Sequence, residues 1–186
     1  MRKIISKEIK EKNKRRNKII VVSVLIGIMI IGTLGYAFQG KEEEAELKKI
    51  THNGLEFYKQ NNFWVTVIDN EYLVLSNNPE DTKSFNSHLR GIEEYRNQPL
   101  YIYSEDSYSE MQIYRNLDEI VLRRQNACLN EKCNDEWPIK TCEDNFIIIE
   151  KSEIAEIIQD KNCVFIRGPS EELSLITDSF LLDIFI

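Results

Sequence analysis

The sequence predicts an α+β protein in which an N-terminal transmembrane helix precedes one domain with a mixed β-sheet and a packed C-terminal helix. Residues 19–38 contain no charged residue. Short β-branched and aromatic runs, bounded by turn-forming residues, recur between residues 63 and 167, and apolar residues near the C-terminus recur at helical spacing. Strands mixed with helices in this way are typical of α+β folds.

The charge of the chain is divided unevenly around the apolar segment. Residues 1–18 contain nine basic and two acidic residues, a charge of +7; because the whole chain carries −7, the remainder carries −14. Basic residues beside a membrane span stay on the cytoplasmic side, so the arm is predicted to lie inside and the acidic domain outside. Attraction to anionic lipid headgroups explains the positive charge of the arm, and no nucleic-acid partner is expected.

The apolar segment at residues 19–38 fits the thickness of a bilayer. At about 1.5 Å per residue, a helix of this length spans the roughly 30 Å hydrocarbon layer. A signal peptide cleaved after Ala37 is the alternative, because Gly35 and Ala37 are small residues at the required positions. The run exceeds the usual length of about 7–15 residues, which favours an uncleaved single-pass anchor. Ser23 and Gly27 would let two such helices approach, so a homo-oligomer is compatible with the sequence.

The anchor is predicted to lead through a stem at residues 39–54 into one domain at residues 55–186. Glu44 and Lys48 stand four residues apart with the acidic residue first, which favours a short helix in the stem. The remainder, roughly 130 residues, is long enough for one domain with its own core.

The first part of the domain is predicted to contain a hairpin and a short helix. Strands at residues 63–68 and 71–76 flank Asp69-Asn70, a pair that suits a tight turn. Between residues 80 and 98, four apolar residues recur at helical spacing, which predicts an amphipathic helix bent near Gly91. These residues are Phe85, Leu89, Ile92 and Tyr95.

A strand and a helix follow that could begin a βαβ unit. The strand begins after Pro99. The helix begins at Ser107, where Glu110 three residues later completes a capping-box pattern, and it is predicted to end near Cys128. Its apolar face comprises Ile113, Leu117, Ile120, Val121 and Ala127.

Three short apolar runs then predict a β-meander. Residues 146–150 and 163–167 have the composition of strands, and residues 153–159 lie between them. The middle run also meets helical spacing, but a strand is favoured there. The meander places its first and third strands parallel to each other.

The chain is predicted to close with a helix from Glu171 to about Ile184 that packs on the sheet. Gly168-Pro169 turns the chain, and Ser170 is expected to cap the helix. No phosphate site is expected at this turn, because Pro169 has no N–H and the acidic first turn would repel an anion. The apolar face comprises Leu173, Ile176, Phe180 and Ile184.

All four cysteines fall in the outer domain, on the side of the membrane where disulfides persist. Cys128, Cys133, Cys142 and Cys163 allow three pairings. In a meander, Cys142 and Cys163 would lie at the same end of two parallel strands, which favours Cys142–Cys163 and leaves Cys128–Cys133 as a local loop. Gaps of 5, 9 and 21 residues do not fit a zinc site, so no metal and no other cofactor is expected.

No local motif predicts catalytic residues. The two histidines, His52 and His88, stand in polar surroundings without a neighbouring ligand or base. Glu105 and Asp106 follow a strand and precede a helix, which is where open α/β sheets bind ligands. They are therefore the candidate ligand-binding residues, although acidic residues at this position also cap helices, and capping is favoured.

A family resemblance rests on about the last fifty residues. It consists of Pro-Ile-x-x-Cys, Asn-Cys before alternating apolar residues and Gly, and an Asp within the closing helix. The matching positions are Pro138, Ile139, Cys142, Asn162, Cys163, Gly168 and Asp178. With the basic arm and one membrane helix, this pattern resembles a group of archaeal single-pass membrane proteins. The likeness is looser at residues 54–76, and Asp183 replaces a glycine frequent in the group. Because the group has no established activity, the resemblance implies only the topology and the Cys142–Cys163 pairing.

These features predict a cell-membrane protein with a cytoplasmic N-terminus and an extracellular C-terminal domain that acts as a binding or assembly module. The expected partners are the lipid bilayer and a protein or another envelope component. The alternative is an accessory envelope enzyme, a hydrolase or a thiol oxidoreductase, with a site assembled by folding. A deep pocket with converging carboxylates would favour the enzyme, and a shallow apolar patch would favour binding.

Overall fold

The computed structural model describes residues 15–16, 18, 20–29, 48–85 and 88–186. The chain divides into two units, Met1–Glu46 and Leu47–Ile186. In the first unit, residues 20–29 are helical. Across the described part of the chain, no helix combines the length and the apolar character needed to cross a membrane. The other residues of the predicted span, most of the basic arm and the predicted stem helix up to residue 47 lie outside the described residues.

The second unit begins with an antiparallel four-stranded sheet in the order β1-β2-β3-β4. Its strands are β1 (Lys49–His52), β2 (Leu55–Gln60), β3 (Phe63–Ile68) and β4 (Glu71–Leu75). The predicted hairpin is confirmed as β3 and β4. Asp69 and Asn70 have φ values of 50° and 69°, which suits a tight hairpin turn. Four residues assigned to the stem by sequence form β1 and pair with β2.

The larger sheet has five strands in the order β10-β11-β9-β5-β6. They are β5 (Pro99–Ser104), β6 (Arg123–Asn126), β9 (Phe146–Lys151), β10 (Glu156–Asp160) and β11 (Cys163–Gly168). All pairings are parallel except that of β10 with β11. The chain passes from β5 through α2 (Ser107–Leu117) to β6, so the predicted βαβ unit is confirmed. Outside this sheet, β7 (Cys128–Leu129) pairs with β8 (Ile139–Lys140).

The predicted meander is wrong in its strand order. Strand β9 pairs directly with β11, and β10 lies at the edge rather than between them. The first four residues of β9 are all buried, whereas β10 has one buried residue, Ile157, among exposed and half-buried ones. A strand with apolar side chains on both faces is most stable where both faces are covered from water. Strands β9 and β11 therefore take inner positions in the sheet. The helical alternative for the middle run is excluded, because residues 156–159 lie in β10 and residues 153–155 are not helical.

Both helix predictions between residues 80 and 128 need correction. The segment before β5 forms only two short 3-10 helices, η1 (Pro79–Asp81) and η2 (Ile92–Glu94), although its apolar side chains still contact the core. Helix α2 begins at Ser107 as predicted but ends at Leu117 rather than near Cys128. Ile120 and Val121, beyond that point, are buried in the connection to β6, because pairing with β5 overrides the helical pattern.

The helix caps also differ from prediction. Asp106, not Ser107, is the N-cap of α2, and Asp106 Oδ2 accepts a hydrogen bond from the Ser109 amide at 2.8 Å. Helix α3 (Leu173–Phe185) confirms the closing helix, but its N-cap is Glu172 instead of Ser170. No side chain caps this end; the amides of Glu172 and Leu173 donate to the Pro169 carbonyl instead.

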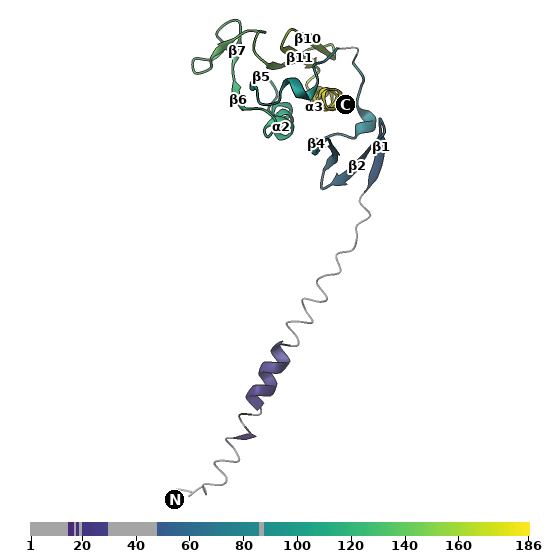
Figure 1. Ribbon diagram of the computed structural model, residues 1–186, viewed down its shortest axis with the longest axis vertical. Helices are drawn as coiled ribbons and strands as arrows, with labels where there is room; N and C mark the ends of the chain where they lie inside the picture. Colours follow the sequence, from purple (N-terminus) through teal and green to yellow (C-terminus); the bar gives the residue numbers. More distant parts are fainter. Residues whose placement is uncertain (1–14, 17, 19, 30–47, 86–87) are drawn as a thin grey trace, which may run out of the picture. The chain divides into compact units, whose positions relative to one another are not determined.

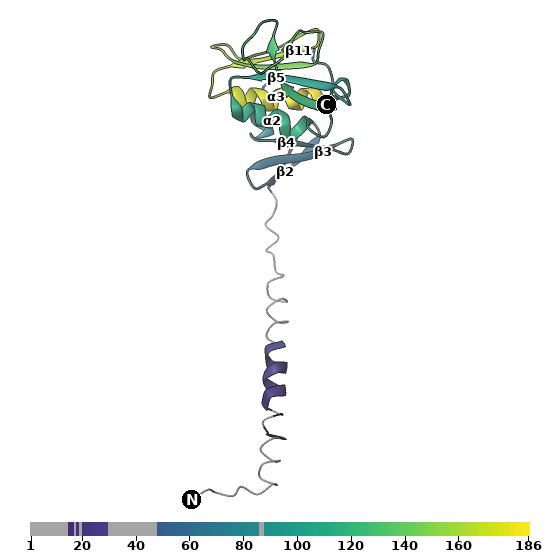
Figure 2. The same cartoon turned by 90° about the vertical axis from the view of Figure 1, so that its left-hand side faces the viewer.

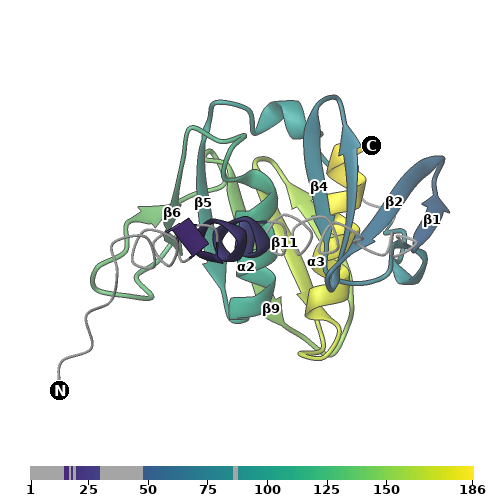
Figure 3. The same ribbon diagram turned by 90° about the horizontal axis from the view of Figure 1, so that it is seen from below.

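Helices α2 and α3 lie between the two sheets (Figure 1, Figure 2). Figure 3 shows both helices from below; on the larger sheet, α2 contacts β5 and α3 contacts β11. Ten of the 13 residues of α3 are buried, and α3 contacts both β11 and β4. A helix that is buried around most of its circumference must be apolar on more than one face. The four residues of the face predicted from sequence are therefore only part of the ten buried ones, which also include Leu181, Leu182 and Phe185.

Asn116 of α2 covers the free edge of β4. Asn116 Oδ1 accepts a hydrogen bond from the Val74 amide at 2.7 Å, and Asn116 Nδ2 donates to the Val74 carbonyl at 3.0 Å. These two bonds replace the pair that a neighbouring strand would make. The edge is thereby protected from pairing with another chain.

Asp178 of α3 joins the small sheet to both helices. Asp178 Oδ2 accepts hydrogen bonds from the amides of Ser76 (2.9 Å) and Asn77 (2.7 Å) and from Asn77 Nδ2 (2.8 Å). Asp178 Oδ1 accepts one from Gln112 Nε2 of α2 at 2.6 Å. Burial raises the pKa of Asp178 to about 6, against the opposing effect of these donors. One buried carboxylate thus connects the end of β4 with α2 and α3.

Gly168 at the end of β11 leaves room for α3. A Cβ atom at this position would lie 2.2 Å from Ile176 Cδ1. Replacing Gly168 with alanine is therefore expected to lower the free energy of unfolding by about 1–3 kcal/mol through overpacking, as measured by urea denaturation.

The Ile176→Val variant supplies the control for Gly168→Ala, because valine lacks the Cδ1 atom. Alone it should cost about 0.5–1.5 kcal/mol. Combined with Gly168→Ala, it should lose less than the sum of the two single variants. Strictly additive losses would show that the crowding does not occur at this contact.

Candidate binding cleft

A polar cleft lies at the N-terminal ends of the parallel strands β5, β9 and β11. Its volume is about 330 Å³. Residues from the segment before β5, from the start of β5, from the loop before β9 and from the turn before β11 form its walls. The lining residues are Arg90, Glu93, Glu94, Arg96, Gln98, Pro99, Tyr101, Glu143, Asp144, Asn145 and Asn162.

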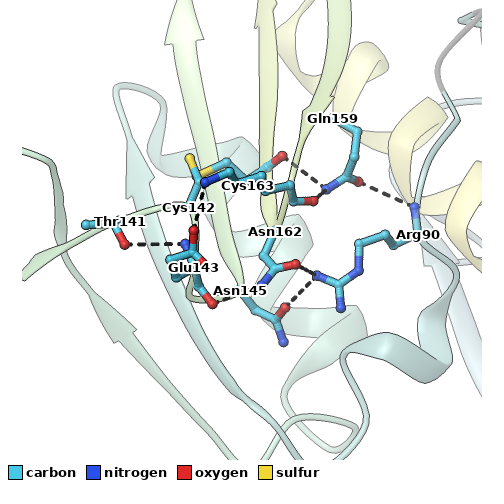
Figure 4. The surroundings of a disulfide bond; sticks show 9 residues. Arg90, Thr141, Cys142, Glu143, Asn145, Gln159, Asn162 and Cys163 are labelled. Carbon is cyan, nitrogen blue, oxygen red and sulfur yellow. Dashed lines mark hydrogen bonds and ion pairs between the residues drawn. A yellow bond between two sulfur atoms is a disulfide. The ribbon is translucent and has the colours of Figure 1, made fainter.

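Arg90 holds the walls of the cleft together. Its Nη1 donates to Asn145 Oδ1 at 3.0 Å and to Asn162 Oδ1 at 2.6 Å (Figure 4). Its Nη2 donates to Glu94 Oε2 at 3.0 Å. The Arg90 amide also donates to Gln159 Oε1 at 3.4 Å. This one residue therefore connects the segment before β5 with the strand starts on the opposite side.

The two asparagines are fixed in turn by backbone groups. Asn162 Nδ2 donates to the Glu143 carbonyl at 2.9 Å, and Asn145 Nδ2 donates to the Glu94 carbonyl at 3.3 Å. The Asn162 amide donates to the Cys142 carbonyl at 3.1 Å. Each asparagine directly precedes a strand of the parallel pair β9 and β11, so the register of that pair places them side by side.

The second arginine of the cleft is also paired with carboxylates. Arg96 donates from Nε and Nη2 to Glu93 and from Nη1 to Glu71. These hydrogen bonds raise the pKa of Arg96, and the bond to Arg96 lowers the pKa of Glu93. Both arginines thus have carboxylate partners within the protein.

Lysines outside the lining hold the carboxylates of the loop before β9. Lys140 Nζ lies 3.2 Å from Asp144 Oδ1 and 4.2 Å from the ring centroid of Tyr101, and its hydrogen bond to Tyr101 is the main cause of its raised pKa. Lys161 Nζ lies 2.7 Å from Glu143 Oε1. The Lys161–Glu143 pair is exposed and the Lys140–Asp144 pair is partly exposed, and surface pairs contribute little stability.

The unoccupied atoms of the cleft are mainly carboxylate oxygens. Glu94, Glu143 and Asp144 each use one oxygen for an ion pair, and no hydrogen bond to another described residue occupies the second oxygen. Glu93 is paired with Arg96, so each of the four lining carboxylates has one cationic partner. The cleft therefore offers free carboxylate oxygens as hydrogen-bond acceptors to a ligand.

Both predicted disulfides are present. Cys142–Cys163 and Cys128–Cys133 have Cα–Cα distances of 4.9 and 5.5 Å. Cys163 is fully buried, in a second apolar cluster on the face of the larger sheet away from the helices. The Cys142–Cys163 bond joins the loop before β9 to the start of β11, and both of these segments line the cleft.

Glu105 and Asp106, the ligand candidates from sequence, do not line this cleft. Glu105 Oε2 accepts a hydrogen bond from the Lys151 amide at 2.9 Å, and Asp106 caps α2. Both stand at the carboxyl ends of the strands, whereas the cleft lies at the opposite ends. Both carboxylates serve the fold in the structure.

Sequence reasoning missed the residues that organise the cleft. Arg90 falls in a segment predicted as helix, and no local motif contains it. Asn145 and Asn162 carried one available signal, since each stands immediately before a predicted strand. That signal indicates proximity only if the two strands are known to be paired.

The geometry gives no catalytic constellation in the described residues. Neither His52 nor His88 lines the cleft. Within the described ranges, no group of three or more His, Cys, Asp or Glu residues is arranged to hold a metal ion. Glu105 and Asp106 do not join the carboxylates of this cleft, and its lining is polar rather than an apolar patch.

Comparison with known proteins gives no match: no protein-family model, curated protein or solved structure is significantly similar to the chain. The resemblance to archaeal single-pass membrane proteins therefore stays a prediction.

Proposed function

We propose that the protein is a single-pass membrane protein whose extracytoplasmic domain binds an envelope partner through the cleft. The basic arm and the uncharged segment at residues 19–38 support the anchor. The two disulfides support an oxidising compartment for the domain. The bilayer is thus one partner, and the second partner is the one that the cleft recognises.

The free carboxylate oxygens of the cleft determine the choice of ligand. Glu94, Asp144 and Glu143 each use one oxygen in an ion pair with Arg90, Lys140 and Lys161, and the second oxygen of each remains as an acceptor. Carboxylates bind guanidinium and ammonium groups through charge-assisted hydrogen bonds. The ligand is therefore a basic side chain on a partner protein of the cell envelope.

The topology is tested by cysteine labelling, since no described cysteine is free. A cysteine introduced as Ser84→Cys, on the exposed surface of the domain, should react with a membrane-impermeant maleimide in intact cells. One introduced as Ser6→Cys, in the basic arm, should react only after permeabilisation. Labelling of both positions, or of the arm alone, in intact cells would exclude the proposed orientation.

The binding site is tested by photo-crosslinking in native membranes. Benzoylphenylalanine at Gln98, an exposed residue of the cleft, should yield an adduct with one partner protein. The same group at Tyr72, which is 67% exposed on the small sheet, should not. Removing the charges with Glu94→Gln and Glu143→Gln should reduce the adduct at least about threefold.

Glu153→Gln is the matched control for the crosslinking, because Glu153 is exposed and does not line the cleft. It should leave the adduct unchanged. Equal adducts at positions 98 and 72, or an adduct insensitive to the loss of the cleft carboxylates, would contradict the proposed site.

A further inference from the structure

The Cys142–Cys163 disulfide stands at the centre of the contacts that close the cleft. Asn145 lies three residues after Cys142, Asn162 directly precedes Cys163, and Gln159 lies four residues before it. All three accept hydrogen bonds from Arg90 (Figure 4). Every such bond that Arg90 makes to the sheet side of the cleft therefore ends within four residues of one cysteine of this disulfide.

Non-covalent contacts around the disulfide are weak by comparison. The ion pairs Lys161–Glu143 and Lys140–Asp144 involve exposed or half-exposed side chains, and pairs of this kind are worth about 0–1 kcal/mol. Gln159 Nε2 donates to the carbonyls of Lys161 (2.7 Å) and Cys163 (3.1 Å), which ties Gln159 to the same turn. The covalent bond is the strongest link between the loop before β9 and this turn.

We propose that Cys142–Cys163 is a redox-sensitive latch for the cleft, so that reduction releases the Arg90 segment while the rest of the domain stays folded. The inference rests on the proposed function only in calling the cleft a binding site. The link between the disulfide and the Arg90 segment rests on the hydrogen bonds of Arg90 alone.

The reductant is a low-molecular-weight thiol. Its thiolate attacks the sulfur of Cys142, the half-buried partner, because Cys163 is fully buried. The S–S bond breaks, a mixed disulfide forms on Cys142, and the Cys163 thiolate takes up a proton. A second thiol then displaces Cys142 as a thiol and leaves the reagent as its disulfide. Two electrons pass from the two thiols to the protein disulfide.

The other disulfide provides a matched control. Cys128–Cys133 closes a loop of exposed or half-exposed residues, and none of the residues that line the cleft lies in that loop. A variant lacking only this bond should lose the loop constraint and keep the cleft closed.

Limited trypsin digestion measures the opening of the segment around Arg90 and needs no ligand. In Cys142→Ser/Cys163→Ser, cleavage after Arg90 should be at least about tenfold faster than in the native protein, since local opening exposes this bond. In Cys128→Ser/Cys133→Ser it should stay within about twofold. Cleavage after Arg167, within the paired strand β11, reports global unfolding and should not rise in parallel.

The variant Asn145→Ala/Asn162→Ala keeps both disulfides and removes two acceptors of Arg90. It should reproduce the faster cleavage after Arg90, which makes the proposal testable even if the cysteine variant fails to fold. Unchanged cleavage after Arg90, an equal rise after Arg167, or an equal rise in the control would each overturn the latch. If the partner were crosslinked outside the cleft, the proposed binding site would be wrong, but the proposal that the disulfide holds the Arg90 segment would be unaffected.

Discussion

Replacing Asp178 with alanine is expected to lower the free energy of unfolding by about 3–5 kcal/mol, because removing one partner of a buried charged network leaves the others unpaired. The amides of Ser76 and Asn77 and the side chains of Asn77 and Gln112 would all lose their acceptor. The small sheet would also lose its link to α3. Urea denaturation followed by circular dichroism measures the loss.

Asp183→Ala is the control on the same helix, because Asp183 is exposed. It should change stability by less than about 0.5 kcal/mol. Asp178→Asn should lose less than alanine does, because it keeps one acceptor oxygen. Gln112 Oε1, buried and without a described partner, could then turn toward the new amide. Losses of equal size at positions 178 and 183 would refute the role of the buried carboxylate.

The raised pKa of Asp178 gives the stability a pH dependence of defined sign. With a pKa of about 6 in the folded protein, against an ordinary value of 3.8, the folded state binds the proton more tightly. This stabilisation is complete below about pH 4 and is lost as the pH rises through 6. The difference in unfolding free energy between the native protein and Asp178→Asn should fall by about 3 kcal/mol over that range. A flat difference would contradict it.

The Cys142→Ser/Cys163→Ser variant is expected to lose about 3 kcal/mol of stability, because the bond closes a loop of 21 residues in the unfolded chain. The shorter loop of Cys128–Cys133, with a separation of 5 residues, should contribute only about 2 kcal/mol. Cys163 is also part of the second apolar cluster, so its loss disturbs packing as well. Chemical denaturation of both double variants, without reductant, gives the comparison.

Loop length explains the stabilisation only if the Cys142→Ser/Cys163→Ser variant loses more unfolding free energy than the Cys128→Ser/Cys133→Ser variant. A larger loss from the Cys128–Cys133 variant would mean that loop length does not dominate. Native mass spectrometry under non-reducing conditions supplies the control that the remaining disulfide has formed in each variant. Only variants with one intact disulfide enter the comparison.

Local patterns predicted those elements whose neighbours lie close in the chain. The β3–β4 hairpin follows from Asp69-Asn70, where two residues with positive φ reverse the chain. The βαβ unit and α3 follow from strand composition and helical spacing. The pairing Cys142–Cys163 followed from parallel strands, and β9 and β11 are parallel, although the predicted strand order was wrong.

Elements that depend on distant partners were predicted poorly. Helix α2 ends at Leu117 because residues 123–126 pair with β5. The spacing of apolar residues along the chain does not reveal this pairing. The segment with Leu89 and Ile92 has helical spacing, yet it forms a loop with a 3-10 turn whose apolar side chains contact the core. In both places the gain from long-range pairing or packing exceeds a small local helix preference.

By itself, the sequence determined the α+β class, the hairpin, the closing helix and the disulfide partners, because short-range spacing and turn chemistry encode them. The anchor and its orientation rest on the sequence alone and remain predictions. Only the tertiary structure decided the strand order and the cleft, because Arg90, Asn145 and Asn162 are separated by up to 72 residues and meet only through the pairing of β9 with β11. A site formed across strand ends has no local signature, since its geometry exists only after the sheet is assembled.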